Sequence, residues 1–141
     1  MCLKVATKKL TAKTDLLVYK CLDTEGGRYC TPFRYHPIFF DRGVCHLEGG
    51  DNALAIEKEW IGYKWIKVIN FGVHAYYKKR EADYTASQFP GCGTKTFYAI
   101  IPKGSKYYLG LDFDVVSTEM IIFRSQRSYG KYAKEHEISE L

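Results

Sequence analysis

Three features that would classify the chain at once are missing from its 141 residues. It has no C-x-x-C pair, its N-terminal residues lack the apolar core of a signal peptide, and no apolar run approaches the roughly 20 residues that span a bilayer. An odd set of five cysteines without paired spacing argues against a disulfide framework. We therefore expect a cytoplasmic protein with free thiols and no membrane contact.

The sequence also lacks internal repeats and low-complexity segments, and its charge is not concentrated in one place. A length of 141 residues suits one domain, which we place at residues 1–130, followed by a charged C-terminal tail or short helix at residues 131–141. A net charge of +5 spread along the chain describes a solvated surface better than a dedicated nucleic-acid binder. The twelve tyrosines favour strands edged with tyrosine.

Strand signals dominate what is present. Apolar runs and alternating polar and apolar residues predict strands at Asp15–Asp23, Arg28–Tyr35, Lys64–Ile69, Gly72–Tyr77, Thr94–Ile101, Lys106–Leu111 and Val115–Phe123. The turn residues Thr24–Gly27 predict that the first two strands form a hairpin. Ile38–Gly50 reads as an irregular loop, and a loop of that length in a small domain is often functional.

Two segments have the spacing of helices. Ala82, Ala86 and Phe89 form an apolar stripe that predicts a helix over Lys79–Phe89, and a Pro-Gly pair then ends it. Asn52–Trp60 is a second, shorter candidate. The fold we expect is a strand-dominated α+β single domain with a curved or two-layer antiparallel or mixed sheet and one or two short helices.

The order of these segments resembles the mono-ADP-ribosyltransferase fold. Val18–Lys20 matches in type the family's early strand that ends on a basic residue, and Phe71–Tyr77 matches its middle strand in layout. Ile101–Tyr108, which reads IPKGSKYY, matches the family's Ile-Pro-Lys-Gly strand end, and Ser117–Ile122 matches its last strand with a catalytic Glu. The chain is also similar to short uncharacterised proteins of bacteriophages and their hosts, which would place it in a host cytoplasm.

This resemblance implies a nucleotide site that binds NAD or a related ADP-ribose nucleotide. Glu119 would be the catalytic carboxylate, which stabilises the oxocarbenium-like state formed when the nicotinamide–ribose bond breaks. Lys20 would hold the pyrophosphate, and His74 or Tyr76 would contact the ribose and nicotinamide, with Ser117 beside them. Three of these residues also have a structural interpretation. Glu119 could face solvent at a strand start, Lys20 could be a snorkelling residue at a sheet edge, and His74 could be a histidine at the edge of the core.

The departures from the family pattern affect activity more than fold. Lys20 stands where an arginine is usual, so a point charge replaces a bidentate grip on phosphate. His74–Tyr76 replaces Ser-Thr-Ser, and Ser117 stands where arginine-modifying members carry a second acid. We therefore expect degenerate or altered transferase chemistry, without arginine modification. Pro102–Gly104 is expected to form a tight turn with Gly104 at positive φ.

Other functions compete with this one. Cys30, His36, Cys45 and His46 lie near one another in the sequence, but their spacing is poor for zinc and we predict no metal site. A second hypothesis is a non-enzymatic module that binds a host protein through an aromatic and basic surface. A third is a single-stranded nucleic-acid binder, with bases stacking on Trp60, Tyr63, Trp65, Tyr76 and Tyr77 beside Lys78, Lys79 and Arg80. A tryptophan-anchored core is the favoured account of these aromatic residues.

Overall fold

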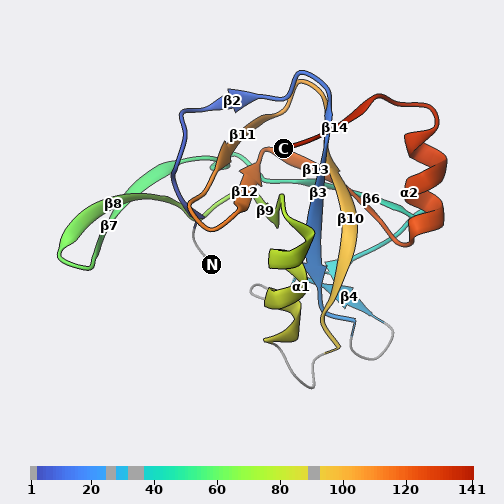
Figure 1. Cartoon of the computed structure of the whole chain (residues 1–141), viewed down its shortest axis with the longest axis horizontal. Helices are drawn as coiled ribbons and strands as arrows, with labels where there is room; N and C mark the ends of the chain where they lie inside the picture. The colour runs from blue at the N-terminus through green and yellow to red at the C-terminus, as the bar shows by residue number, and fades with distance from the viewer. Residues whose placement is uncertain (1–2, 25–27, 32–36, 89–92) are drawn as a thin grey trace.

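Two long neighbouring strands form the centre of the structure, a computed structural model that describes residues 3–24, 28–31, 37–88 and 93–141 (Figure 1). Strand β3 (Asp15–Leu22) pairs in antiparallel register with β10 (Lys95–Ile101), from Leu16 opposite Ile101 to Leu22 opposite Lys95. Continuous runs of apolar and aromatic residues are typical of strands covered on both faces. Both strands confirm the prediction.

The other strands assemble around this pair. They are β1 (Leu3–Lys4), β2 (Leu10–Thr11), β4 (Tyr29–Cys30), β5 (Pro37–Ile38), β6 (Val44–Glu48), β7 (Ile56–Ile61), β8 (Lys64–Ile69), β9 (Val73–Tyr76), β11 (Lys106–Leu109), β12 (Asp114–Ser117), β13 (Glu119–Phe123) and β14 (Ile138–Glu140). Nine strands make one sheet in the order β2-β11-β12-β9-β3-β10-β13-β6, with β14 added parallel to β3. Strands β1-β8-β7 and β4-β5 form two smaller sheets. This strand-dominated α+β domain with antiparallel sheets and two helices confirms the expected class.

The large sheet curves because one stretch of chain serves both of its halves. The sequence predicts a single strand over Val115–Phe123, but the structure divides it at Thr118 into β12 and β13. Strand β12 pairs with β9, whereas β13 pairs with β10, and β3 lies between β9 and β10. Two consecutive strands therefore join positions that are four neighbours apart in the sheet, which requires the sheet to bend.

The concave side of the curve holds the main core. Alternate residues of each strand face it, among them Leu16, Val18 and Leu22 of β3 and Val73 and Ala75 of β9. The other face of the sheet carries the two helices, α1 (Lys79–Ser87) against β3 and β10, and α2 (Gln126–Ala133) against β10 and β13 (Figure 1).

Helix α1 lies where the apolar stripe predicts it. Ala82 is fully buried, and the Cys21 thiol donates to its carbonyl oxygen at 3.2 Å, which ties the helix to β3. Phe89, the last residue of the predicted stripe, lies outside the described residues. Helix α2 was not predicted, although Ser125 and Ser128 form a capping box at its start.

The C-terminal residues add to the sheet. Residues 131–141, which the sequence sets apart as a tail or short helix, contain the end of α2 and strand β14. Strand β14 pairs with β3 from Ile138 opposite Asp15 to Glu140 opposite Leu17. It occupies the edge of β3 beyond the point where β9 pairs with Tyr19.

Two predicted elements are wrong. Ile38–Gly50, expected as an irregular loop, contains β6, which pairs with β13 along five residues and borders the large sheet. Asn52–Trp60, expected as a helix, contains a turn followed by β7. The β-branched and aromatic residues of β7 favour a strand once β8 is there to pair with them. Of the predicted strand Arg28–Tyr35, β4 covers Tyr29–Cys30, and residues 32–36 lie outside the described part.

Candidate functional site

Lys20 lies inside the core instead of at a sheet edge. Its side chain shares a face of β3 with Val18 and Leu22, and the residue is 8% exposed. The ammonium Nζ donates to the carbonyl oxygen of His74 at 2.6 Å. Burial lowers the pKa of Lys20 from 10.5 to about 8, because the core disfavours the charged form. A pyrophosphate in solvent cannot reach this group, and the alternative of a snorkelling edge residue is also wrong.

His74 and Tyr76 lie on the other face of β9. They alternate with Val73 and Ala75, which face the main core. A ring nitrogen of His74, Nε2, lies 3.1 Å from the carbonyl oxygen of Asn70. Burial raises the pKa of Tyr76 despite a hydrogen bond with Thr85 of α1, so its phenol stays neutral. These two side chains therefore face away from Lys20.

Ser117 and Glu119 lie at the bend between β12 and β13. Ser117 is fully buried, and its hydroxyl donates to the backbone carbonyl of Glu119 at 2.7 Å. The Glu119 carboxylate accepts a hydrogen bond from Ser105 Oγ at 3.0 Å, directly after the Pro102–Gly104 turn. Gly104 has φ +90, which confirms the expected turn conformation. Glu119 is half-buried and stands opposite Glu48 of β6, so two acids share this edge.

The five predicted nucleotide-site residues do not gather around one cavity. Lys20 meets the backbone of His74, and Ser117 meets the backbone of Glu119, in both cases through hydrogen bonds that support the sheet. Lys20 pairs with Phe97 of β10, whereas β13, which begins at Glu119, pairs with Ala99 and Ile100 in the second half of β10. These positions fit structural roles better than contact with one ligand.

The candidate metal ligands are scattered in the described part of the chain. Among the described residues, no three histidine, cysteine or acidic side chains come together in a way that could hold an ion. Cys45 is a free thiol, and His36 lies outside the described part of the chain. The described residues also contain no helix with the length and apolar character needed to cross a membrane.

A two-stranded arm is the feature that departs most clearly from the sheet body. We call residues 56–69 the β7–β8 arm; its strands β7 and β8 are joined by Gly62 and Tyr63. Strand β1 pairs with Val68 and Ile69 at the base, while β7 pairs with β8 along its whole length. In Figure 1 the arm extends away from the helices and the large sheet.

Both tryptophans of the chain lie on this arm. Trp60 and Trp65 are directly opposite each other across the two strands, and their rings meet edge to face with centroids 5.5 Å apart. They are 57% and 65% exposed. The expected tryptophan-anchored core is therefore wrong: the hydrophobic clusters of the described residues form without either ring.

Two lysines flank the tryptophan pair. Lys58 and Lys67 stand directly opposite each other, two residues from Trp60 and Trp65 on each strand. Residues two apart on a strand share a face. We call the exposed face formed by these four residues the Trp–Lys face. The opposite face carries Glu57 and Glu59 together with Lys64, so acidic side chains outnumber basic ones there and the two sides of the arm differ in charge.

The tip of the arm is a tight turn with an unusual residue. Gly62 and Tyr63 both have positive φ, +59° and +66°, which is the pattern of a type I′ hairpin turn. Glycine and asparagine tolerate this conformation, whereas a bulky side chain is strained in it. Tyr63 is nevertheless there, 92% exposed, beyond the tryptophan pair.

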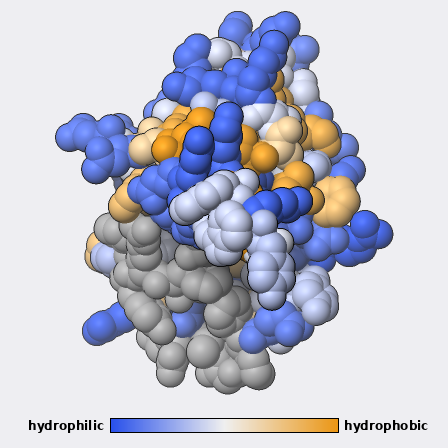
Figure 2. Space-filling view, turned by 90° about the vertical axis from the view of Figure 1, so that its left-hand side faces the viewer, coloured by the Kyte–Doolittle hydropathy of each residue, from blue (hydrophilic) through white to orange (hydrophobic). Residues whose placement is uncertain are grey.

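Figure 2 views the molecule from the side on which the arm projects. Pale side chains, of intermediate hydropathy, lie at the centre of this view among strongly hydrophilic ones, and apolar surface lies above them. Trp60, Tyr63 and Trp65 are exposed on the arm that projects on this side.

The sequence pointed to part of this face and missed the rest. Trp60, Tyr63 and Trp65 were expected to stack bases beside Lys78, Lys79 and Arg80, and Lys58 was not considered with them. The missed signal is the mirror arrangement of Lys-x-Trp and Trp-x-Lys around Gly62 and Tyr63, since a two-residue turn there places these pairs opposite each other. Tyr76 and Tyr77, considered with them, lie at the end of β9 instead.

Comparison of the chain with known protein families, with curated proteins and with solved structures finds no match.

Proposed function

We propose that the protein is a non-enzymatic binding module that takes single-stranded nucleic acid on the Trp–Lys face of the β7–β8 arm. The observation that carries this proposal is the juxtaposition of two cross-strand pairs, exposed Trp60 and Trp65 beside exposed Lys58 and Lys67. Single-strand binders combine flat aromatic rings, on which bases stack, with cations that contact the phosphates.

The lysine pair is what argues most specifically for an anionic partner. Like charges directly opposite in an antiparallel pair destabilise a hairpin by a few tenths of a kcal/mol to about 1 kcal/mol. Lys58 and Lys67 impose this cost on an arm that has few other contacts. A phosphate between the two ammonium groups removes the repulsion. The lysine pair therefore destabilises the free arm and favours the binding of an anion.

The tryptophan pair has two roles. Edge-to-face contact of Trp60 and Trp65 stabilises a hairpin that would be marginal on its own. The outward faces of both rings stay in solvent, where a nucleobase can stack on them. Residues two apart on a strand are separated by about 7 Å, so one nucleotide can place its base on a tryptophan and its phosphate at the neighbouring lysine.

The two faces of the arm differ in charge, so a polyanion is expected on one of them only. Glu57 and Glu59 lie on the opposite face with a single lysine, Lys64, so that face favours a polyanion less than the Trp–Lys face does; Glu57 also accepts a hydrogen bond from the side chain of Asn70 at 2.9 Å. We therefore expect a strand of nucleic acid to bind along one side of the arm. The free thiols of Cys21 and Cys45 suit a reducing compartment, so we place this activity in the cytoplasm.

Tryptophan fluorescence tests the proposal directly, because the only two tryptophans in the sequence are Trp60 and Trp65. Titration with single-stranded DNA or RNA of about ten nucleotides should quench the emission through stacking. Trp65→Ala should weaken binding about tenfold, the effect of losing one stacked base. Tyr84→Ala, which removes an exposed aromatic ring from α1, is the matched control and should leave affinity unchanged.

A second comparison separates binding from folding. Lys67→Gln should raise the stability of the protein slightly, by removing the repulsion with Lys58, and should weaken nucleic-acid binding. Lys131→Gln makes the same charge change on α2 and should alter neither. Emission that does not change with either nucleic acid at low salt would overturn the proposal.

The predicted transferase-like architecture and its NAD site stay a prediction for the body of the molecule. What supports them is the Pro102–Gly104 turn beside Glu119, with Ser105 holding the carboxylate. The burial of Lys20 and the opposite facing of His74 and Tyr76 argue for an altered, non-catalytic use of that scaffold. A nucleotide would then have to bind elsewhere.

A further inference from the structure

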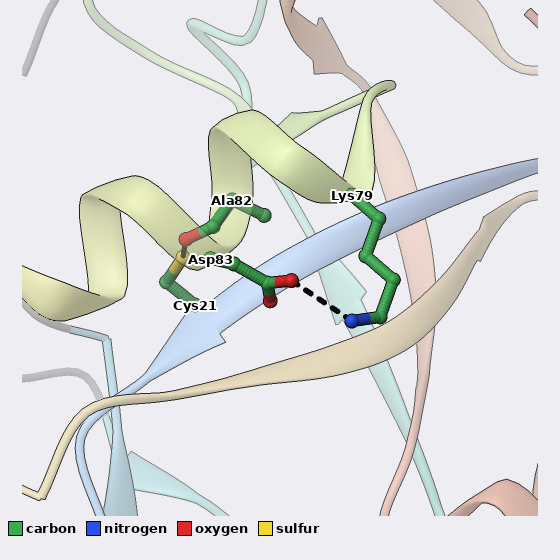
Figure 3. A network of polar contacts seen from close by, with 4 residues as sticks. All are labelled: Cys21, Lys79, Ala82 and Asp83. Atoms are coloured by element: carbon green, nitrogen blue, oxygen red, sulfur yellow. Dashed lines mark hydrogen bonds and ion pairs between the residues drawn. The ribbon is translucent and has the colours of Figure 1, made fainter.

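The two central strands of the large sheet are paired on both of their edges. Strand β3 lies between β10 on one side and β9 with β14 on the other, and β10 lies between β3 and β13. Helix α1 lies over β3, where the Cys21 thiol donates to the carbonyl oxygen of Ala82. On the same helix Lys79 pairs with Asp83 at 2.8 Å, as Figure 3 shows. The centre of the sheet therefore offers no place for a further strand.

Strand β7 of the arm, in contrast, has a neighbour on one side only. It is the last strand in the order β1-β8-β7, and in the part of the chain that the structure describes no strand lies beyond it. It pairs with β8 one residue to one, from Ile56 opposite Ile69 to Ile61 opposite Lys64, so no bulge interrupts its six residues. It also contains no proline. A regular edge strand of this length is a template on which another extended chain can pair.

The register identifies the backbone groups that point outward from β7. Ile61 and Lys64 flank a two-residue turn and exchange both backbone hydrogen bonds, and such hydrogen-bonded pairs recur at every second residue. Lys58 and Lys67 form one of the pairs in between. The carbonyl oxygen of Lys67 accordingly turns away from β7 and accepts from the N–H of Val5 at 2.9 Å. By the same alternation, the N–H and C=O of Lys58 turn away from β8.

Three residues of β7 present outward backbone groups. Ile56 and Trp60 lie two residues to either side of Lys58, so their N–H and C=O groups point in the same direction. The side chains of all three residues are exposed to solvent. An extended chain beside β7 can therefore exchange hydrogen bonds with three residues of the strand.

The side chains of β7 determine which chain fits beside it. Glu57 and Glu59 lie on one face of the arm, and Lys58 lies between them on the other. Opposite charges directly across an antiparallel pair are favourable, and like charges are unfavourable. A second copy of β7 violates this rule. Every antiparallel register that joins at least two outward residues of each copy places Glu57 opposite Glu59, or one of these glutamates opposite itself.

We propose that β7 binds an extended segment of a partner protein in which a basic, an acidic and a basic residue follow one another. The segment adds to the edge of the arm as an antiparallel strand, with its acidic residue opposite Lys58 and its basic residues opposite Glu57 and Glu59. The outward backbone groups supply the hydrogen bonds, and the alternating charges select the partner. The proposal uses the edge of the arm and stands whether or not the Trp–Lys face binds nucleic acid.

Synthetic peptides of equal composition test the selection by charge. A peptide with blocked ends, Lys-Glu-Lys at its centre and Thr-Val on each side should slow hydrogen exchange at the backbone amides of Ile56, Lys58 and Trp60, measured by NMR. A peptide with Lys-Lys-Glu at its centre has the same net charge but places two like-charged pairs across the strands. It should bind about tenfold more weakly.

Removal of single backbone donors tests the addition of a strand. Lys58→Pro removes an outward N–H and keeps the pairs with β8, because proline is tolerated where the N–H of an edge strand faces solvent. Lys58→Gln loses the same charge but keeps the N–H, and it should bind the Lys-Glu-Lys peptide about tenfold more tightly than Lys58→Pro does. N-methylation of the central glutamate of the peptide removes the reciprocal donor without any change to the protein, and should also weaken binding about tenfold.

Two results would overturn the proposal. Equal affinities for the Lys-Glu-Lys and Lys-Lys-Glu peptides would refute the selection of the partner by alternating charge. Unchanged affinity after N-methylation, or unchanged hydrogen exchange at Ile56, Lys58 and Trp60, would refute the addition of a strand at this edge.

Discussion

Replacing Lys20 with methionine measures the cost of holding an amine inside the core. Methionine keeps the length of the side chain and removes the charge. The pKa of Lys20 falls from 10.5 in the unfolded chain to about 8 in the folded protein because of burial. Each unit of difference corresponds to about 1.4 kcal/mol, so the charged lysine destabilises the fold by about 3 kcal/mol at pH values below 8.

The sign of the pH dependence follows from this direction. Between about pH 8 and pH 10.5 the unfolded chain holds a proton on Lys20 that the folded protein has lost. Stability therefore rises with pH in this window, and the penalty is complete below it and absent above it. Cys21 and Tyr132 titrate in an overlapping range with pKa values raised by burial, to about 11 and about 12, which lowers stability as pH rises.

Urea unfolding of both proteins at a series of pH values separates these effects, because the cysteine and tyrosine contributions largely cancel in the difference. At pH 7 Lys20→Met should be more stable by about 1 kcal/mol, since removal of a cost of about 3 kcal/mol is partly offset by about 2 kcal/mol for the carbonyl of His74, which loses its donor. This advantage should shrink by about 1.4 kcal/mol per pH unit above pH 8 and change sign. A difference that stays constant from pH 7 to 10 would refute the buried, proton-losing lysine.

Two further predictions concern single contacts that hold the fold. Gly72→Ala should lower the free energy of unfolding by about 2 kcal/mol, because Gly72 has φ +129 and a Cβ there would lie 2.6 Å from Val116 Cγ2. Gly130→Ala is the control, because a Cβ at that position meets open space. If urea unfolding gives the Gly72→Ala and Gly130→Ala proteins equal stabilities, the clash is contradicted. Tyr132→Phe should lower the free energy of unfolding by about 1–3 kcal/mol, because the Tyr132 hydroxyl donates to buried Asp15 at 2.8 Å. Thermal unfolding measures this loss of stability. A loss no larger than that of Tyr84→Phe would contradict the role of the hydrogen bond.

The central strands could be predicted from the sequence because both of their faces are covered. Strands β3 and β10 contain long apolar and aromatic runs, and a strand is the ready interpretation of such a run next to turn residues. The apolar stripe of α1 predicted that helix in the same way. Strands β6 and β7 are short and polar, and their residues become strands through pairing with β13 and β8. Local sequence does not show that pairing.

The candidate sites were harder to predict for a different reason. Lys20 shares a face of β3 with Val18 and Leu22, but only the curvature of the sheet makes that face a closed core. The division at Thr118, which produces the curvature, is a bend within one apolar run and has no sequence signal of its own. Trp60 and Trp65 were expected inside because large apolar residues usually are. A hairpin that projects from the body reverses that expectation.

The salt dependence of single-stranded DNA binding tests the central claim most directly. If Lys58 and Lys67 each contact one phosphate, the logarithm of the affinity should fall with the logarithm of salt concentration with a slope of about −1.4. The double variant Lys58→Gln and Lys67→Gln should bring that slope close to zero, while the matched change Lys131→Gln leaves it in place. Tryptophan emission at each salt concentration gives both values. A slope that is the same in the double variant and in the unmodified protein would contradict nucleic-acid binding on the Trp–Lys face.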